Sequence, residues 1–232
     1  KRAAPREHSK WCAAHQGDIN FGYGLMTAVH REGVKEALLQ EQGWICAYTG
    51  RAITKASSHI EHLRPQTPWK AHIGLDVDYM NLAACWPAPG HEPQSKYGAR
   101  FKGDWPKPSE DSFFVSPLSV GCEARFEFNF QGHITAKEGD VAAKTTIRKL
   151  GLDAPLLTDL RRQEIVGVLG KTRSLKLADA KARLRALEEQ ERELKQGANV
   201  RLSPYCFALK QSLQKHIRTL VNIRIHSSKP KE

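Results

Sequence analysis

The segment from Trp44 to Gly103 constrains the fold of this 232-residue chain most, because its apolar residues follow no regular period. Short apolar runs alternate there with histidine, proline and glycine. An amphipathic helix needs apolar residues at every third or fourth position, and a half-buried strand needs them at every second position. The segment therefore cannot form a regular helical or sheet layer. It is expected to be a compact site built from loops, a hairpin and a short helix.

The sequence around this segment follows clearer patterns. Residues 1–27 are rich in glycine and polar residues and are expected to be irregular, on the surface or against a partner. Apolar residues at helical spacing predict a helix from Ala28 to Gln42. Strict alternation from Arg125 to Phe130, followed by a glycine turn, predicts a β-hairpin whose return strand lies near His133 to Ala136.

Helical patterns dominate after Asp140. The expected helices are Val141 to Leu150, a segment that Asp153 can cap and Gly170 ends, a leucine-striped segment from Leu177 to Leu194, and a last helix that Ser203 and Pro204 open. The sequence thus predicts an α+β fold, with a compact core over residues 28–117. Residues 118–232 are expected to form a hairpin plus a basic helical region.

Positive charge is concentrated in the C-terminal part of the chain. The whole chain has 36 Lys and Arg against 25 Asp and Glu, a net charge of +11. Residues 1–143 contain 16 of each sign, whereas residues 144–232 contain 20 basic and 9 acidic residues. A basic surface attracts phosphate polyanions at long range. Nucleic acid is therefore the expected partner, and a solvated surface with no partner is the alternative.

The cysteines and the apolar runs bear on location. The five cysteines are odd in number and widely spaced, unlike a secreted disulfide framework. No apolar run approaches the roughly 20 residues of a membrane helix, and residues 1–16 lack the apolar core of a signal peptide. We expect a cytoplasmic protein with reduced thiols and no membrane partner.

The run His59-Ile60-Glu61-His62-Leu63-Arg64-Pro65 carries the strongest chemical signal. It places three ionisable groups of the kind that bind metals within four residues, and Asn81 and His91 follow it. Phosphodiester hydrolysis needs a hard cation that neutralises developing charge and a base that activates water. Glu61 and His91 can hold the cation, and His62 can be the base. On a strand, Glu61 and His62 would point to opposite faces, so the strand is expected to end or twist before its proline.

Several further motifs accompany this run. They are Cys46-Ala-Tyr-Thr-Gly-Arg51, Tyr79-Met-Asn81-Leu82 with Cys85, Lys102-Gly103-Asp104, Ala124 to Glu127, Thr146 to Leu152, and Leu157 to Arg161. Together with Ile60 to Pro65 they resemble the HNH nucleases of the Septu and retron-associated antiphage systems. The resemblance covers most of the chain from about residue 30 onward. It implies a ββα-metal core, in which a hairpin packs on a short helix around one divalent ion.

The resemblance also implies roles for single residues. Glu61 would be the first metal ligand, His62 the general base, Asn81 the residue that holds the His62 loop or ring in place, and His91 the last ligand. Asn81 could instead be the N-cap of the short helix, and His91 could be merely exposed. His59 could support the site from behind, contact a phosphate, or simply belong to the strand. Hard, oxygen-rich ligands favour Mg²⁺, with Mn²⁺ also compatible.

One departure concerns zinc. Many relatives carry two Cys-x-x-Cys pairs that hold a structural zinc beside the active site. Here the first pair reads Cys46-Ala47-Tyr48-Thr49 and the second reads Cys85-Trp86-Pro87-Ala88, so half of the thiolates are absent. We therefore expect no structural zinc, and we expect Cys46 and Cys85 to pack as small buried apolar groups.

Two groups of basic residues have more than one explanation. Lys96, Arg100 and Lys102 follow the site and could contact phosphates beside the scissile bond, or could be ordinary solvated charges. The leucine-striped helix carries a second group beside four glutamates, so intrahelical ion pairs are expected there, with a coiled partner helix as the alternative. The second group comprises Arg183, Arg185, Arg192 and Lys195.

The resemblance further implies partners and leaves the substrate open. Septu nucleases act with an ABC/SMC-type ATPase encoded beside them, and some are joined to a retron with its reverse transcriptase and msDNA. The expected function is thus a metal-dependent endonuclease that acts as an antiphage effector, with DNA as the favoured substrate. An RNA nuclease, for instance against tRNA, and a catalytically decayed nucleic-acid-binding subunit are the alternatives. The leucine stripe and residues 1–20 are candidate docking surfaces.

Overall fold

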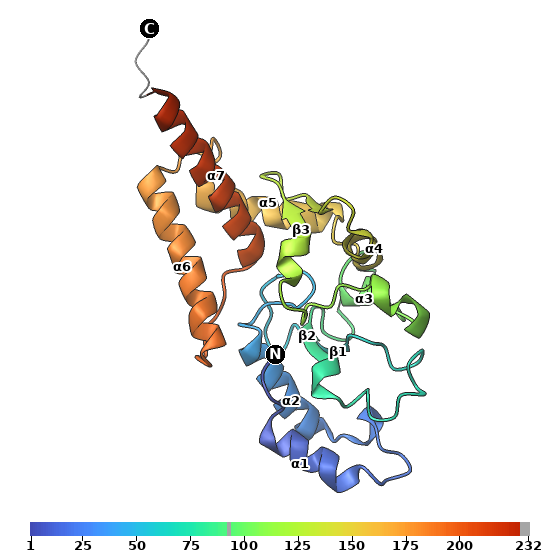
Figure 1. Ribbon diagram of the computed structural model, residues 1–232. Coiled ribbons are helices and arrows are strands. Elements are labelled where there is room, and N and C mark those ends of the chain that lie inside the picture. Colours follow the sequence, from blue (N-terminus) through green and yellow to red (C-terminus); the bar gives the residue numbers. More distant parts are fainter. Residues whose placement is uncertain (92–93, 228–232) are drawn as a thin grey trace.

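The computed structural model describes residues 1–91 and 94–227, with side chains up to residue 225. In chain order its elements are α1 (Arg6–His15), η1 (Tyr23–Leu25), α2 (Ala28–Glu41), β1 (His59–His62), η2 (Tyr79–Asn81), β2 (Leu82–Cys85), α3 (Ala99–Lys102), η3 (Pro108–Phe113), η4 (Cys122–Arg125), β3 (Phe126–Phe128), β4 (Ile134–Ala136), α4 (Val141–Leu150), α5 (Pro155–Leu169), α6 (Leu177–Lys195) and α7 (Cys206–Ser227), where η marks a 3₁₀ helix. Two small antiparallel sheets lie among helices (Figure 1). The predicted α+β class is confirmed.

Helix α1 shows that the expectation of an irregular N-terminal segment is wrong for residues 6–15. The helix has few apolar residues, but Trp11 and Cys12 pack against the core and a buried histidine adds hydrogen bonds. His8 Nε2 donates to the carbonyl of Val77 at 2.8 Å, and its Nδ1 lies 2.9 Å from Nε2 of His30 on α2. Ahead of the helix, Lys1 forms an ion pair with Glu41 at 2.5 Å. The N-terminal residues are therefore part of the folded body.

The hairpin of β1 and β2 lies at the centre of that body. His59 pairs with Cys85 and His62 with Leu82 in the antiparallel register. Every residue of β2 is buried, whereas every residue of β1 is partly exposed. A strand buried on both faces needs small or apolar side chains, and β2 reads Leu-Ala-Ala-Cys. Strand β1 can therefore present polar side chains while β2 anchors it.

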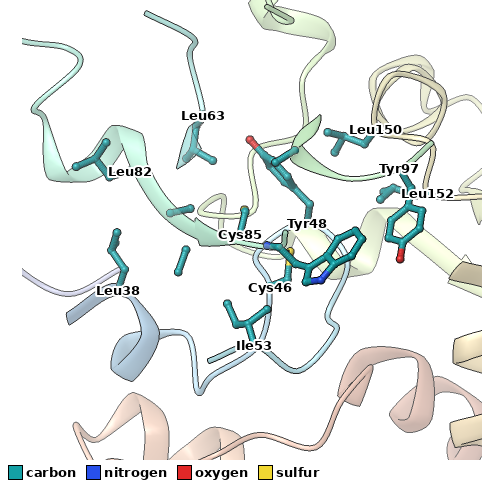
Figure 2. Packing of buried hydrophobic residues seen from close by; sticks show 14 of the residues in the cluster. Leu38, Cys46, Tyr48, Ile53, Leu63, Leu82, Cys85, Tyr97, Leu150 and Leu152 are labelled. Atoms are coloured by element: carbon teal, nitrogen blue, oxygen red, sulfur yellow. The ribbon is translucent and has the colours of Figure 1, made fainter. Parts of the chain in front are cut away.

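One hydrophobic core joins the two regions expected from the sequence. Leu38 of α2 and Leu82 of β2 belong to the same cluster as Leu150 of α4 and the nearby Leu152. Figure 2 shows these side chains around Cys46 and Cys85. The C-terminal region therefore packs directly against the body that carries the hairpin.

The predicted C-terminal elements are confirmed, with two local corrections. The N-cap of α5 is Ala154 rather than Asp153. Helix α7 begins at Cys206 rather than at Ser203, because Tyr205 has a φ of 54°, which a right-handed helix does not allow. The hairpin of β3 and β4 turns at Gly132, whose φ is 82° and where an added Cβ would lie 2.3 Å from the carbonyl oxygen of Thr158. Only glycine fits this contact between the turn and α5.

Helices α6 and α7 form an antiparallel hairpin at one side of the molecule (Figure 1). Lys210 near the start of α7 pairs with Glu191 near the end of α6, at 2.5 Å. Ala180 and Leu187 of α6 are buried in a second core cluster that includes Leu213 of α7. The leucine stripe is thus covered by the chain itself, which removes it as a free docking surface. No helix among the described residues is both long enough and apolar enough to cross a membrane.

Candidate functional site on the β1–β2 hairpin

The pleat of β1 places His59 and Glu61 on one face of the strand and His62 on the other. His59 Nε2 lies 3.2 Å from Glu61 Oε2, and His59 Nδ1 lies 2.6 Å from the carbonyl oxygen of Pro87. A carbonyl only accepts, so Nδ1 carries a proton and Nε2 is the nitrogen that faces the carboxylate. Burial lowers the pKa of His59, but its hydrogen bond and charge attraction to Glu61 outweigh burial and raise it.

Glu61 has a second cationic partner, Lys102 at the end of α3. Lys102 Nζ lies 2.7 Å from Glu61 Oε1 and donates to the carbonyl of His62 at 3.1 Å. The Lys102 side chain is only 1% exposed, whereas that of Glu61 is 13% exposed. The hydroxyl of Tyr48 lies 3.5 Å from the same carboxylate oxygen. Burial raises the pKa of Glu61, but His59 and Lys102 together outweigh burial and lower it, so the carboxylate is ionised.

His62 is held by a backbone carbonyl on the opposite face. Its Nε2 lies 2.9 Å from the carbonyl oxygen of Asp76, and the ring of Tyr23 meets it edge-on at 4.8 Å between centroids. Nε2 must therefore carry the proton, which leaves the lone pair on Nδ1. Burial lowers the pKa of His62 more than the Asp76 carbonyl raises it, so the ring is neutral near pH 7. Within the described part of the chain, Nδ1 has no hydrogen-bond partner.

Asn81 fixes the backbone that holds His62. Asn81 is only 1% exposed, and its Oδ1 accepts a hydrogen bond from the backbone N–H of Arg64 at 2.8 Å. It also donates to the carbonyls of Arg64 and Leu75, both at 3.0 Å. Leu75 directly precedes Asp76, so Asn81 ties the end of β1 to the residue that anchors the imidazole. Asn81 is the last residue of η2, and the N-cap of that helix is Asp78. The alternative expectation, that Asn81 is a helix N-cap, is therefore wrong.

His91 lies apart from these groups, on an exposed turn where its backbone N–H donates to Ala88 at 3.1 Å. Over the ranges 1–91 and 94–227, no three His, Cys, Asp or Glu side chains converge as a metal site requires. The imidazole that lies beside Glu61 is therefore that of His59, not that of His91. The expected pairing of Glu61 with His91 does not form in this structure.

The donor set near Glu61 nevertheless suits a divalent ion in part. Neighbouring ligands of an octahedral Mg²⁺ lie about 3.0 Å apart when metal–ligand distances are about 2.1 Å. His59 Nε2 and Glu61 Oε2, at 3.2 Å, have about this separation. Mg²⁺ usually takes one or two protein ligands and completes its shell with water and substrate phosphate. The Lys102 ammonium opposes a second cation, so a bound phosphate would have to balance the charge.

The two cysteines lie in the core behind this site, as expected from the incomplete Cys-x-x-Cys pairs. Cys46 is 1% exposed and Cys85 is fully buried (Figure 2). The backbone N–H of Trp86 donates to Cys46 Sγ at 3.4 Å. Burial raises the pKa of Cys46, but hydrogen bonds from Cys85, Thr49 and this N–H outweigh burial and lower it to about 6. The same burial and the neighbouring Cys46 raise the pKa of Cys85.

The basic residues after the site do not form one group. Lys96 and Arg100 are exposed, whereas Lys102 points into the protein toward Glu61. Only the first two could meet a phosphate without rearrangement. A separate cavity of about 460 Å³ lies between Tyr48 and the C-terminal helices, and neither Glu61 nor His62 lines it. The candidate site is thus the surface of β1 and the end of α3, and Lys96 and Arg100 lie just before or within α3.

Comparison with known proteins gave no further guide, because no family model and no curated protein matches the chain. Two members of the site could not be recognised from motifs alone. Asp76 acts through its backbone carbonyl, which carries no residue signal. Tyr48 belongs to the Cys46 motif, for which the sequence implied no role at the site, yet its hydroxyl lies 3.5 Å from Glu61 Oε1.

Proposed function

We propose that the chain is a metal-dependent endonuclease of the HNH type, with β1, β2 and α3 as its ββα-metal core. The observation that carries this proposal is the state of His62. Its Nε2–H is committed to the Asp76 carbonyl, and burial lowers its pKa, so a neutral ring has Nδ1 free. A general base must have a free lone pair at the working pH.

In this proposal the phosphodiester lies at the end of β1, where the strand stops at His62, so that groups from both of its faces can reach it, and each residue has one task. His62 Nδ1 takes a proton from the attacking water, and the Asp76 carbonyl steadies the imidazolium that results. Asn81 keeps that carbonyl in place through its bonds to Arg64 and Leu75. Glu61 and His59 would hold the divalent ion, which would replace the proton that His59 Nε2 donates to Glu61 in this structure, with Mg²⁺ most suitable and Mn²⁺ also compatible. When bound, the ion supplies positive charge for the non-bridging and leaving oxygens of the phosphodiester.

The ion pair between Glu61 and Lys102 gives the site a built-in cation. The Lys102 ammonium neutralises Glu61 while no divalent ion is bound, which makes a buried carboxylate tolerable. Its second hydrogen bond, to the carbonyl of His62, also fixes the backbone directly after His62. Lys102 is therefore a positioning residue rather than a phosphate contact in this proposal. Lys96 and Arg100 remain the candidates for phosphate contact.

For the biological role, we propose an antiphage effector of the Septu type, acting with an ABC/SMC-type ATPase and, in retron-linked systems, with a reverse transcriptase and its msDNA. The motif resemblance supports this role, and the net charge of +11 supports a nucleic-acid substrate. DNA is the favoured substrate. An RNA nuclease and a decayed nucleic-acid-binding subunit are the alternatives that an experiment must separate.

The test incubates the chain, alone and with the ATPase, with plasmid DNA and with total RNA, in Mg²⁺ and in EDTA. We expect plasmid cleavage in Mg²⁺ and none in EDTA. Cleavage of RNA but not plasmid would move the assignment to an RNA nuclease. Binding of both polymers without cleavage, in the presence of the ATPase, would contradict the proposed activity and favour the decayed subunit.

A further inference from the structure

Charge is segregated along the hairpin of α6 and α7. Residues 171–185, which lead into α6 and form its first half, contain six basic residues and one acidic residue. Residues 186–195, its second half, contain two basic and four acidic residues. Helix α7 contains no Asp or Glu along its whole length. One end of the hairpin is therefore strongly basic, and the other end is close to balanced or acidic.

The cations at the two ends differ in their partners. At the acidic end, Arg192 pairs with Glu189, and Lys210 pairs with Glu123 and Glu191. At the other end, Arg183 and Arg185 form no ion pair with any residue that the structure describes. The expectation that intrahelical ion pairs neutralise Arg183 and Arg185 is therefore wrong. It holds for Arg192.

The loop before α6 packs against the later half of α7 at this end of the hairpin. His216 Nε2 donates to the carbonyl of Leu175 at 2.8 Å, which brings the loop before α6 against the later half of α7. The guanidinium of Arg173 lies 4.7 Å above the ring of Phe130. We define the basic tip as the exposed residues Lys171, Arg173, Lys176, Lys181, Arg183, Arg185 and Arg218. Figure 1 shows that this end of the hairpin lies away from β1 and β2.

The seven cations of the basic tip form no ion pair with any described residue and repel one another, so a polyanion that releases its counter-ions on binding would stabilise the tip. An ordinary solvated helix face mixes both signs, as the second half of α6 does. Long, flexible Lys and Arg side chains on an exposed helix suit contacts with a phosphate backbone, which position a nucleic acid without reading its bases. The acid-free stretch of α7 beside them extends the same surface.

We propose that the basic tip is a second nucleic-acid contact surface, which holds the phosphate backbone of a duplex at a distance from the β1–β2 site. The inference rests on the proposed function, because it assigns the same substrate class to a second surface. It predicts sequence-independent binding with a strong dependence on salt. The tip would hold the polymer while the hairpin site acts on a phosphodiester elsewhere along it.

The test uses the full chain and a fluorescent 30-base-pair DNA duplex, with anisotropy measured over a range of salt concentrations in EDTA. The tip variant combines Arg183→Gln with Arg185→Gln. The control combines Arg192→Gln with Lys195→Gln on the same helix, which changes the net charge equally. Melting temperatures of both variants verify that they are folded.

Because the tip variant loses two cations, the slope of log K against log salt concentration should become less negative by roughly 1.8. This change corresponds to roughly 60-fold weaker binding at 100 mM salt. The control should bind within about twofold of the unaltered chain, because its cations already have acidic neighbours. Equal weakening in both variants, or no weakening in the tip variant, would overturn the inference. So would binding of anionic lipid vesicles or an acidic peptide in place of the duplex.

Cleavage in Mg²⁺ separates this inference from the proposed function. If the unaltered chain cleaves DNA but the tip variant binds the duplex normally, the nuclease proposal stands and the second contact surface is refuted. If the chain binds the duplex through the tip but cleaves neither DNA nor RNA, even with the ATPase, the contact surface stands and the nuclease proposal is refuted.

Discussion

Replacing Lys102 with methionine tests whether a buried ion pair holds the candidate site together. The change removes an ammonium that is 1% exposed and 2.7 Å from Glu61 Oε1, while methionine fills much of the same volume. Removing one partner of a buried pair costs about 3–5 kcal/mol, because the other charge stays buried without compensation. Glu61 keeps His59 at 3.2 Å and is 13% exposed, so the lower end of this range, about 3 kcal/mol, is expected.

For a chain of this length, 1 kcal/mol shifts the melting temperature by about 2–4 °C, so Lys102→Met should melt about 6–12 °C lower. Thermal and urea unfolding both measure this. Lys107→Met, at an exposed position, is the matched control and should stay within about 0.5 kcal/mol. Combining Lys102→Met with Glu61→Leu should recover most of the loss, because no buried charge remains. If Lys102→Met melts with the control, the ion pair does not stabilise the fold and the reasoning fails.

Two further predictions concern stability elsewhere in the fold. Burial, followed by the charge of His8, lowers the pKa of His30 below its unfolded value of about 6.5, so the folded state binds fewer protons. The stability that neutral His30 contributes is therefore fully present above about pH 6.5 and is lost as the pH falls below it. The urea midpoint of the unaltered chain should be lower at pH 5.5 than at pH 7.5, and this decrease should be smaller in His30→Gln. An equal decrease in His30→Gln would contradict the linkage. Gly132→Ala should cost at least about 2 kcal/mol in urea unfolding, more than Gly139→Ala, where φ is also positive but nothing lies within 4 Å; equal costs would refute the proposed clash with Thr158.

Elements with strong local signals could be predicted from the sequence. Helix α4 agrees with its predicted bounds because both ends are marked locally. The Asp140 side chain accepts the N–H of Ala143, and Gly151 ends the helix in the left-handed conformation. Helix α1 could not be predicted in this way. It is attached to the body by contacts with residues distant in sequence, namely those of His8 with Val77 and His30 and the packing of Trp11 against the core.

The candidate site was predictable only where its members are neighbours in sequence. Glu61 and His62 stand in one motif, and the pleat of a strand fixes their opposite directions. The pairing of Glu61 with Lys102 depends on where α3 packs, 41 residues later, which no local pattern specifies. His91 was chosen as a ligand by its spacing from Asn81. Spacing does not report that the turn faces solvent, nor that Pro87 holds His59 beside Glu61.

The most direct test of the account is the single-turnover rate of plasmid cleavage by His62→Ala in Mg²⁺, with the ATPase present. His133→Ala is the control, because His133 is exposed on the β3–β4 turn. A positioned general base contributes roughly 100-fold to 10,000-fold to a rate, so His62→Ala should be slower by that factor while the control cleaves normally. Cleavage by His62→Ala at the rate of the unaltered chain would contradict the central claim that the β1–β2 hairpin carries the base of a nuclease.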